Sequence, residues 1–336
     1  MKKETRLSGT QGILDLLQRN IPWVILIVLC IFFSSLSENF FSFRNIISIL
    51  NQNAYVIVAA LGISLIMMSG GVDLSCGYQM SIISVITGIL LTETPLPIPV
   101  VVVISMLLGI AMNILNTMLS VKLGLGLFMV SLATMNIFQG ISYTISEARI
   151  INGLPESFKF LGSGSIGPIP FPIILAAVLF LIMNFFLNRT YWGRYIYALG
   201  GNTEASRLAG INVLGVRLMI STIAGVFVAL STMMLLGRLG TAQSTAGPGT
   251  EFTIMTGVLV GGVSLRGGEG RLHNVLAGIL IMAIFGNGMQ MAGYGVYPQF
   301  IAKGVIMIAA IAFDVFQYNR RQRMLNTRKN EAAHAL

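Results

Sequence analysis

The sequence has little charge for its length. Of its 336 residues, 10% are Asp, Glu, Lys or Arg, whereas 55% are hydrophobic. Soluble domains carry about 25% charged residues, so this deficit argues against a soluble enzyme or binding module and indicates a chain that lies in lipid. Its length is therefore best counted in membrane spans, each of which needs about 20 residues with few charges.

Residues and motifs that support catalysis are also scarce. The chain has two Cys and two His, and neither Cys has a His nearby in the sequence. No glycine-rich stretch continues into the Lys of a nucleotide-binding P-loop, and the sequence contains no H-E-x-x-H, no G-x-S-x-G and no Cys/His cluster. These absences argue against nucleotide binding, metal binding and hydrolysis by this chain, and no cofactor is expected. The 19 Met residues are scattered through apolar stretches and are interpreted as packing residues.

Apolar segments fill most of the sequence, and glycine and proline interrupt them as in closely packed membrane helices. They predict an all-α, polytopic transmembrane helical bundle of about ten spans. The membrane domain is expected at residues 21–317, between a cytoplasmic segment at 1–20 and a basic cytoplasmic tail at 318–336. No Ala-x-Ala pattern follows the first segment, which disfavours a cleavable signal peptide. The segments are 21–36, 46–68, 78–92, 97–120, 126–145, 171–187, 218–237, 252–265, 272–291 and 298–316.

The distribution of Lys and Arg along the sequence predicts how the chain is oriented in the membrane. Four lie in predicted outside segments (Arg44, Arg149, Lys159 and Arg238), Lys303 lies within the last span, and the remaining sixteen of the 21 lie in predicted inside segments. This bias places both termini in the cytoplasm. The net charge of +9 then indicates contact with anionic lipid rather than with nucleic acid. Two connections are long enough to be interaction surfaces, residues 147–170 outside and residues 188–217 inside.

Charged residues are rare within the predicted spans. Lys303 and Asp314 share the last span, but they are eleven residues, about three helical turns, apart. Both are interpreted as interfacial. Lys303 is expected near the outside end, and Asp314 near the cytoplasmic end, where Asp314 can pair with an Arg of the tail. A proton relay formed by the two residues is the less favoured alternative. A proton-coupled carrier needs a carboxylate deep in the bundle. Its absence from the predicted spans argues against self-powered transport.

Carboxamides recur in the spans in pairs three residues apart, so each pair shares one helix face. Amides both donate and accept hydrogen bonds, which suits a path for an uncharged hydroxylated solute. The alternative, which has somewhat more weight, is that they hold helices together. The candidate path residues are Asn113, Asn116, Asn136, Gln139, Asn287 and Gln290, together with Phe128 and Thr134.

Two glycine-rich loops resemble each other. Residues 70–77 read GGVDLSCG and residues 261–268 read GGVSLRGG, with five of the eight positions identical. Such a likeness between apolar segments indicates an internal repeat, and the glycines predict tight connections between packed helices. Asp73, with Ser75 nearby, is expected to cap the following helix, and a partner contact or a gate remains the alternative. The motif residues are Gly71, Asp73, Ser75, Gly261, Gly262 and Gly268.

Three stretches together resemble a known family. They read GGVDLSCG at 70–77, GRYIYALGGNTEASRLAGINV at 193–213 and GVLVGGVSLRGGEG at 257–270. In order and spacing they resemble the permease subunits of bacterial sugar ABC importers, and most of all the ribose and galactose group. The resemblance implies a homodimer in the bacterial inner membrane, a separate cytoplasmic ATP-binding subunit and a periplasmic sugar-binding protein.

The resemblance also implies that residues 193–213 dock onto the ATP-binding subunit. The residues that carry the match are Gly200, Gly201, Asn202, Glu204, Ala205, Arg207 and Gly210. Where the family usually has Pro-Phe and Thr-Leu-Gly-Thr runs, this chain reads GLFMVSLATM, with Gly126, Ser131 and Ala133 at the changed positions. Where the family often has Ile-Ala-Ala after Glu251, the chain reads FTIMTG. These departures leave the identity of the sugar open.

The sequence therefore predicts a permease subunit that moves a neutral monosaccharide inward and has no ATP site of its own. The runner-up is a self-standing secondary transporter or facilitator of small polar solutes. A membrane enzyme or a scaffold has little support.

Overall fold

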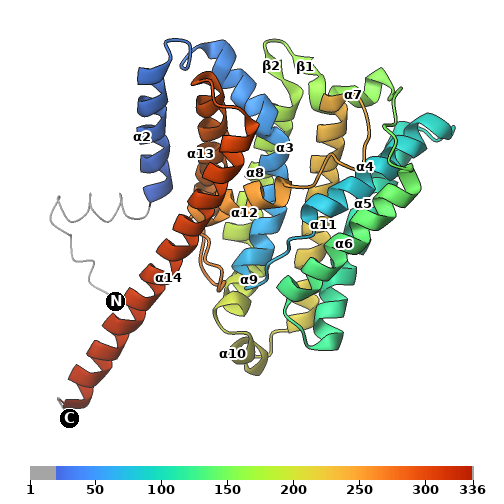
Figure 1. Ribbon diagram of the computed structural model, residues 1–336. Helices are drawn as coiled ribbons and strands as arrows, with labels where there is room; N and C mark the ends of the chain where they lie inside the picture. The colour runs from blue at the N-terminus through green and yellow to red at the C-terminus, as the bar shows by residue number, and fades with distance from the viewer. Residues whose placement is uncertain (1–19, 335–336) are drawn as a thin grey trace.

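The computed structural model describes the backbone of residues 20–334 and the side chains of residues 20–319 (Figure 1). The predicted segment 1–20 thus lies outside the described residues except for Asn20, as do most side chains of the predicted tail. The long helices are α2 (Ile21–Leu36), α3 (Phe43–Met68), α4 (Cys76–Glu93), α5 (Ile98–Leu123), α6 (Leu127–Ser146), α8 (Phe171–Arg189), α11 (Val213–Leu239), α12 (Thr250–Val260), α13 (Leu272–Met291) and α14 (Val296–His334). The connections hold α7 (Glu156–Ser163), β1 (Ser165–Ile166), β2 (Ile169–Pro170), α9 (Tyr191–Gly201) and α10 (Thr203–Leu208).

The predicted all-α, polytopic bundle is confirmed. Each predicted apolar segment coincides with a helix, and seven helices are long and apolar enough to cross a membrane. Two more, α2 and α12, are apolar but shorter. The count of ten spans, the position of the termini and the internal repeat remain predictions. The hairpin of β1 and β2 is the one sheet in the described part of the chain.

One predicted boundary is wrong in a way that matters for the site. The segment expected at 252–265 ends as a helix at Val260. Gly262 has a φ of 79°, a left-handed conformation that glycine adopts readily and that ends the helix. Residues 261–271 consequently form a loop at the same end of the bundle as α9 and α10 (Figure 1).

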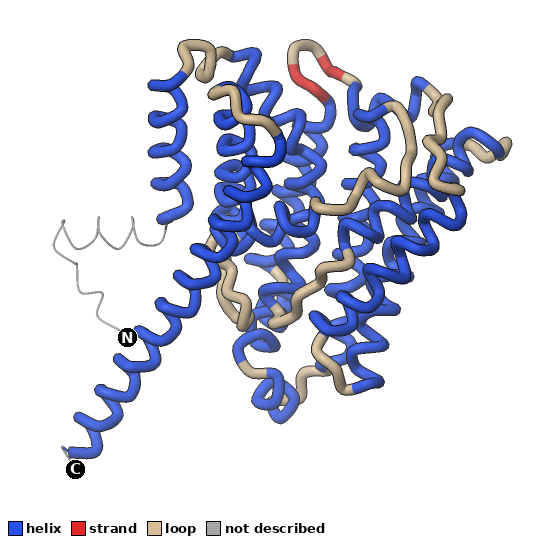
Figure 2. Tube along the Cα trace, viewed as in Figure 1, coloured by secondary structure: helices blue, strands red, loops and turns tan. Residues whose placement is uncertain are grey.

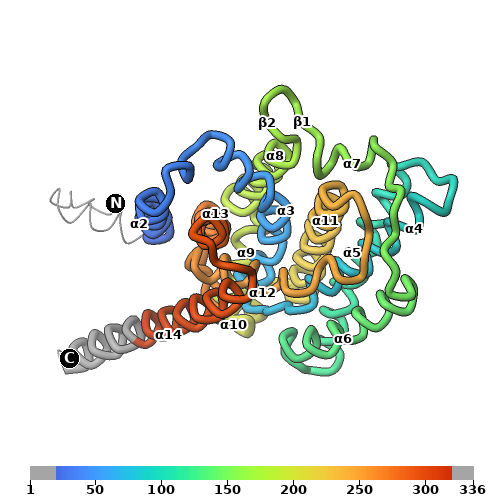
Figure 3. The backbone as a smooth tube through the Cα atoms, turned by 45° about the horizontal axis from the view of Figure 1, so that its top comes forward, coloured from blue at the N-terminus to red at the C-terminus, as the bar shows by residue number. Residues whose placement is uncertain are grey.

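Small residues allow the central helices to pack closely. Gly109 of α5 and Gly225 of α11 face each other so tightly that a Cβ on Gly225 would lie 2.5 Å from the Gly109 carbonyl oxygen. A Cβ on Gly62 of α3 would lie 2.8 Å from the Phe227 Cβ of α11. Both crossings follow the small-residue packing of membrane helices. They join α3 and α5 to α11, which lies between them (Figure 3).

Two helices, α4 and α12, begin inside the bundle rather than at its surface. α4 follows a non-helical stretch at residues 71–75, and α12 follows a longer one at residues 240–249 (Figure 2). The starts of the two helices meet, because a Cβ on Gly247 would lie 2.8 Å from the Met80 Cβ and would overlap the Gly77 carbonyl group. Non-helical backbone at such depth is tolerated only where it is buried in protein or lines a polar cavity.

Candidate transport and coupling sites

A buried polar network lies where α4 begins. Asp73 is 1% exposed, and its Oδ1 accepts hydrogen bonds from the Ser75 backbone N–H at 2.7 Å and the Ser75 hydroxyl at 2.6 Å. The Gln79 amide donates to Ser75 Oγ at 2.8 Å and to Asp73 Oδ2 at 3.3 Å. From α5, Asn113 donates to Gln79 Oε1 at 2.6 Å and Asn116 donates to Ser75 Oγ at 2.8 Å. The network fixes the stretch before α4 against α5. The Asp73 carboxylate accepts the N–H two residues further on, at the N-cap residue Ser75, and so closes a turn before α4, whereas no side chain caps α4 itself by a hydrogen bond.

A second buried carboxyl group lies at the start of α12. Glu251 is 1% exposed, and both of its carboxyl oxygens accept the Gly249 backbone N–H, at 2.9 and 3.1 Å. The expectation that no carboxylate lies deep in the bundle is therefore wrong. Asp73 and Glu251 both lie beside non-helical stretches that turn into the bundle, whereas the sequence predicts glycine-rich stretches to be tight connections at the ends of spans. Both groups accept N–H donors at a helix start, which is a structural use of the carboxylate.

The predicted amide pairs have different surroundings in the structure. Asn113 and Asn116 are buried in the network at α4. Asn287 of α13 exchanges two amide hydrogen bonds of 3.1 Å with Asn45 of α3. These three amides join helices in the structure. Gln290, the helical neighbour of Asn287, is exposed.

The predicted path residues on α6 behave differently. Asn136 is exposed and its amide donates only to the Leu132 carbonyl of its own helix, at 3.1 Å. The Gln139 amide reaches the Ser244 carbonyl at 3.5 Å, which brings α6 beside the stretch that precedes α12. Phe128 is 46% exposed, while Thr134 is buried and donates to the Ser131 carbonyl. The path role of these residues remains a prediction. Asn136 of α6, like Gln290 of α13, has an exposed amide.

The two similar loops meet each other and α9 at a contact made of glycines. The Gly268 N–H donates to the Met68 carbonyl at 2.7 Å. A Cβ on Gly267 would lie 2.5 Å from Gly70 N and 2.9 Å from Gly200 Cα. A Cβ on Gly200 would overlap the Met68 carbonyl oxygen and the Gly268 N–H. Only glycine permits this approach, so we call Gly70, Gly200, Gly267 and Gly268 the glycine contact.

A tyrosine of α9 strengthens this contact. The Tyr197 hydroxyl donates to the Gly270 carbonyl at 2.8 Å. Burial raises the pKa of the Tyr197 phenol, against a lowering by nearby Arg271, so the hydroxyl keeps its proton and remains a donor. Of the other motif residues, Gly71 packs against Ile66 and Leu127, and Gly261 packs against Asn274 of α13.

The matched segment after Gly201 turns sharply at the surface. Asn202 Oδ1 accepts the Ala205 N–H at 2.9 Å and so caps α10, whereas Gly210 ends that turn with a φ of 82°. Glu204 and Arg207 form an ion pair at 3.7 Å whose side chains are 68% and 65% exposed. α9 and α10 thus lie together at one end of the bundle (Figure 1).

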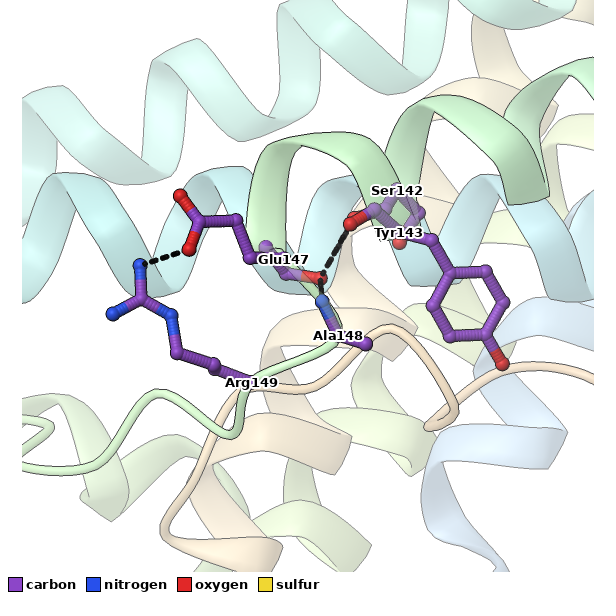
Figure 4. Close-up of polar contacts among 6 residues, drawn as sticks. Ser142, Tyr143, Glu147, Ala148 and Arg149 are labelled. Atoms are coloured by element: carbon purple, nitrogen blue, oxygen red, sulfur yellow. Dashed lines mark hydrogen bonds and ion pairs between the residues drawn. The ribbon is translucent and has the colours of Figure 1, made fainter.

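The other end of the bundle carries the predicted outside connection. α6 ends there at Ser146. The next residue, Glu147, has a φ of 50° and forms an exposed ion pair with Arg149 at 3.1 Å (Figure 4). Two backbone hydrogen bonds between Ile151 and Ala242, of 2.8 and 2.9 Å, then join this connection to the stretch that precedes α12. The predicted outside connection is thus hydrogen-bonded to the backbone that leads to Glu251.

A polytopic bundle with two helices that begin inside it, a capped surface segment at one end and no P-loop has the features of a membrane transport subunit. The chain belongs to the family described as "Branched-chain amino acid transport system / permease component", which matches residues 45–311. It is a permease component rather than an enzyme, and this family assigns ATP binding to a separate subunit.

Individual relatives are similar over nearly the whole chain. The ribose import permease protein of Haemophilus influenzae is 32% identical over 296 residues, which cover 87% of this chain and 91% of the relative. The galactose/methyl galactoside import permease protein of Escherichia coli is 31% identical over 318 residues, 89% of this chain and 95% of the relative. The D-allose transport system permease protein of Escherichia coli is 32% identical over 292 residues, 87% of this chain and 90% of the relative. No solved structure matches the chain.

Proposed function

We propose that this chain is the membrane subunit of an ATP-driven importer that moves a neutral monosaccharide into the cytoplasm of a bacterium. The observation that carries the proposal is full-length similarity to permeases whose names specify ribose, galactose and allose import. These three sugars are uncharged polyols. They suit neutral amides and hydroxyls better than a charged site.

The two ends of the bundle fit different partners in this proposal. α9 and α10 bind the cytoplasmic ATP-binding subunit, and the connection at residues 147–170 receives a periplasmic sugar-binding protein. The position of the last turns of α14, on the same side as α9 and α10, agrees with a cytoplasmic C-terminus in the inner membrane (Figure 1).

We place the sugar path along α6 and the neighbouring stretch at residues 240–249. α8 exposes large apolar side chains such as Leu181, Ile182 and Phe185, and these suit lipid. The exposed face of α6 also carries Asn136, and a polar side chain in a span is costly against lipid. In a homodimer, a second copy of the chain would cover this face of α6. The Asn136 amide would then face protein or water instead of lipid.

The proposal predicts that uptake depends on the partner ATPase. Vesicles that contain the permease with its ATP-binding subunit and the sugar-loaded binding protein should accumulate the sugar when ATP is supplied. The chain lacks a P-loop, so vesicles with the permease alone should show no uphill uptake. The measurement is radiolabelled sugar inside the vesicles. Accumulation by the permease alone would instead support a self-standing transporter.

Reversing the charges of Glu204 and Arg207 should weaken assembly without weakening the fold. The pair is exposed and separated by 3.7 Å, so it contributes little to the free energy of unfolding, about 0–1 kcal/mol. With Glu204→Lys and Arg207→Glu combined, co-purification with the ATP-binding subunit should fall while the unfolding temperature of the isolated permease stays constant. The matched control is the same reversal of Glu147 and Arg149, an exposed pair at the opposite end. Equal loss of ATPase binding in both variants would contradict the assignment.

A further inference from the structure

The stretch between α3 and α4 joins the proposed docking segment to the proposed path helix. One end of it, at Gly70, belongs to the glycine contact with Gly200 of α9. At the other end, the Leu74 N–H donates to the Ser131 hydroxyl of α6 at 3.1 Å. We propose that residues 70–75 transmit displacement of α9 to α6, and that Ser131 is the positioning residue through which α6 receives it. This inference rests on the proposed transport function.

The stretch is short and held at both ends. The stretch has only six residues and therefore spans at most roughly 20 Å between the glycine contact and α6. At the α9 end, the neighbouring Met68 carbonyl accepts from Gly268, and Gly70 N–H bonds back to Met67 at 3.0 Å. At the other end, Ser75 accepts from Asn116 at 2.8 Å. A short segment anchored at both ends passes on a displacement instead of absorbing it.

The hydrogen bond to Ser131 is the link with α6. The Ser131 side chain is fully buried, accepts from Leu74 and donates to the Phe128 carbonyl at 2.9 Å. It therefore connects the stretch to the first turn of the helix that carries Phe128 and, about two turns further on, Asn136. Gly71 packs against Leu127 at the start of the same helix.

The three elements also share a pocket. It has a volume of ≈ 240 Å³, lies beside the stretch, and is lined in part by Gly70, Gly71, Leu127 and Gly200. α9, the stretch and α6 thus border the same space.

The test is the ratio of sugar transported to ATP hydrolysed by the complete complex in vesicles. Ser131→Ala removes the acceptor for the Leu74 N–H, and we expect this ratio to fall about fivefold or more, with ATP hydrolysis in the absence of sugar unchanged. Ser131→Thr keeps the hydroxyl and should restore the ratio. The matched control is Ser142→Ala, because Ser142 is also fully buried on α6 but its hydroxyl has no hydrogen-bond partner.

The outcomes separate transmission from other roles. A purely structural role of Ser131 would lower ATP hydrolysis and transport in parallel and leave their ratio constant, which would overturn the inference. A wild-type complex that neither transports nor hydrolyses ATP would instead count against the proposed function. If the Ser131→Ala permease fails to assemble, amide hydrogen exchange in the wild-type complex tests the inference instead. ATP binding should change protection at residues 69–75 and 127–135 together, and a change in only one of them would overturn the inference.

Discussion

Gly200→Ala should abolish most transport. An added Cβ would overlap two backbone groups, the Met68 carbonyl oxygen and the Gly268 N–H, and backbone cannot rotate away as a side chain can. α9 must then move off the two loops, which breaks the glycine contact that ties the docking segment to the bundle. We expect sugar uptake by the complete complex to fall about tenfold or more, measured as initial rate in vesicles.

The adjacent glycine provides the matched control. Gly201 lies on the same helix, but a Cβ placed on it meets no atom within 4 Å. Gly201→Ala changes helix propensity by about the same amount but leaves the glycine contact intact, so uptake should fall much less than in Gly200→Ala. If both variants lose transport equally, helix propensity rather than close approach explains the effect, and the glycine contact has no special role.

Much of the helical framework could be predicted because each helix carries its own signal. The apolar run predicted at 21–36 is the helix Ile21–Leu36, and the run at 272–291 is the helix Leu272–Met291. Such runs are long, bounded by polar or glycine residues, and independent of distant partners. The end of α12 could not be placed this way, because Val263 and Leu265 are as apolar as a helix interior and only the conformation of Gly262 stops the helix.

The interior polar groups could be predicted only in part, because spacing defines a helix face but not its neighbour. Asn113 and Asn116 were expected on one face, and they share one, yet their partners Gln79 and Ser75 come from a different helix start. Asn45, the partner of Asn287, lies 242 residues away in sequence. Glu251 was missed as a site residue altogether. The signal that could have found it is a carboxylate directly after a glycine-rich, proline-containing break between apolar runs.

A second large effect, on stability, is expected when the polar network at the start of α4 is broken. Asp73→Ala removes the acceptor for both the N–H and the hydroxyl of Ser75 and leaves the buried N–H without a partner. We expect the free energy of unfolding to fall by about 3 kcal/mol and the membrane yield to drop with it. Unfolding of the purified permease in detergent is the measurement. Ser81→Ala is the control, because Ser81 is fully buried on α4 and its hydroxyl has no hydrogen-bond partner.

A conservative change at the same position separates the two interpretations of Asp73. Asp73→Asn retains an oxygen that accepts from the Ser75 N–H, so a purely structural role in the turn before α4 predicts a loss of only about 1 kcal/mol and nearly normal uptake. A gate that depends on the carboxylate predicts a stable protein without uptake. Because Asp73 is buried and bonded entirely to the network around Ser75, we expect Asp73→Asn to transport. A folded but inactive Asp73→Asn permease would show that the carboxylate acts in transport itself.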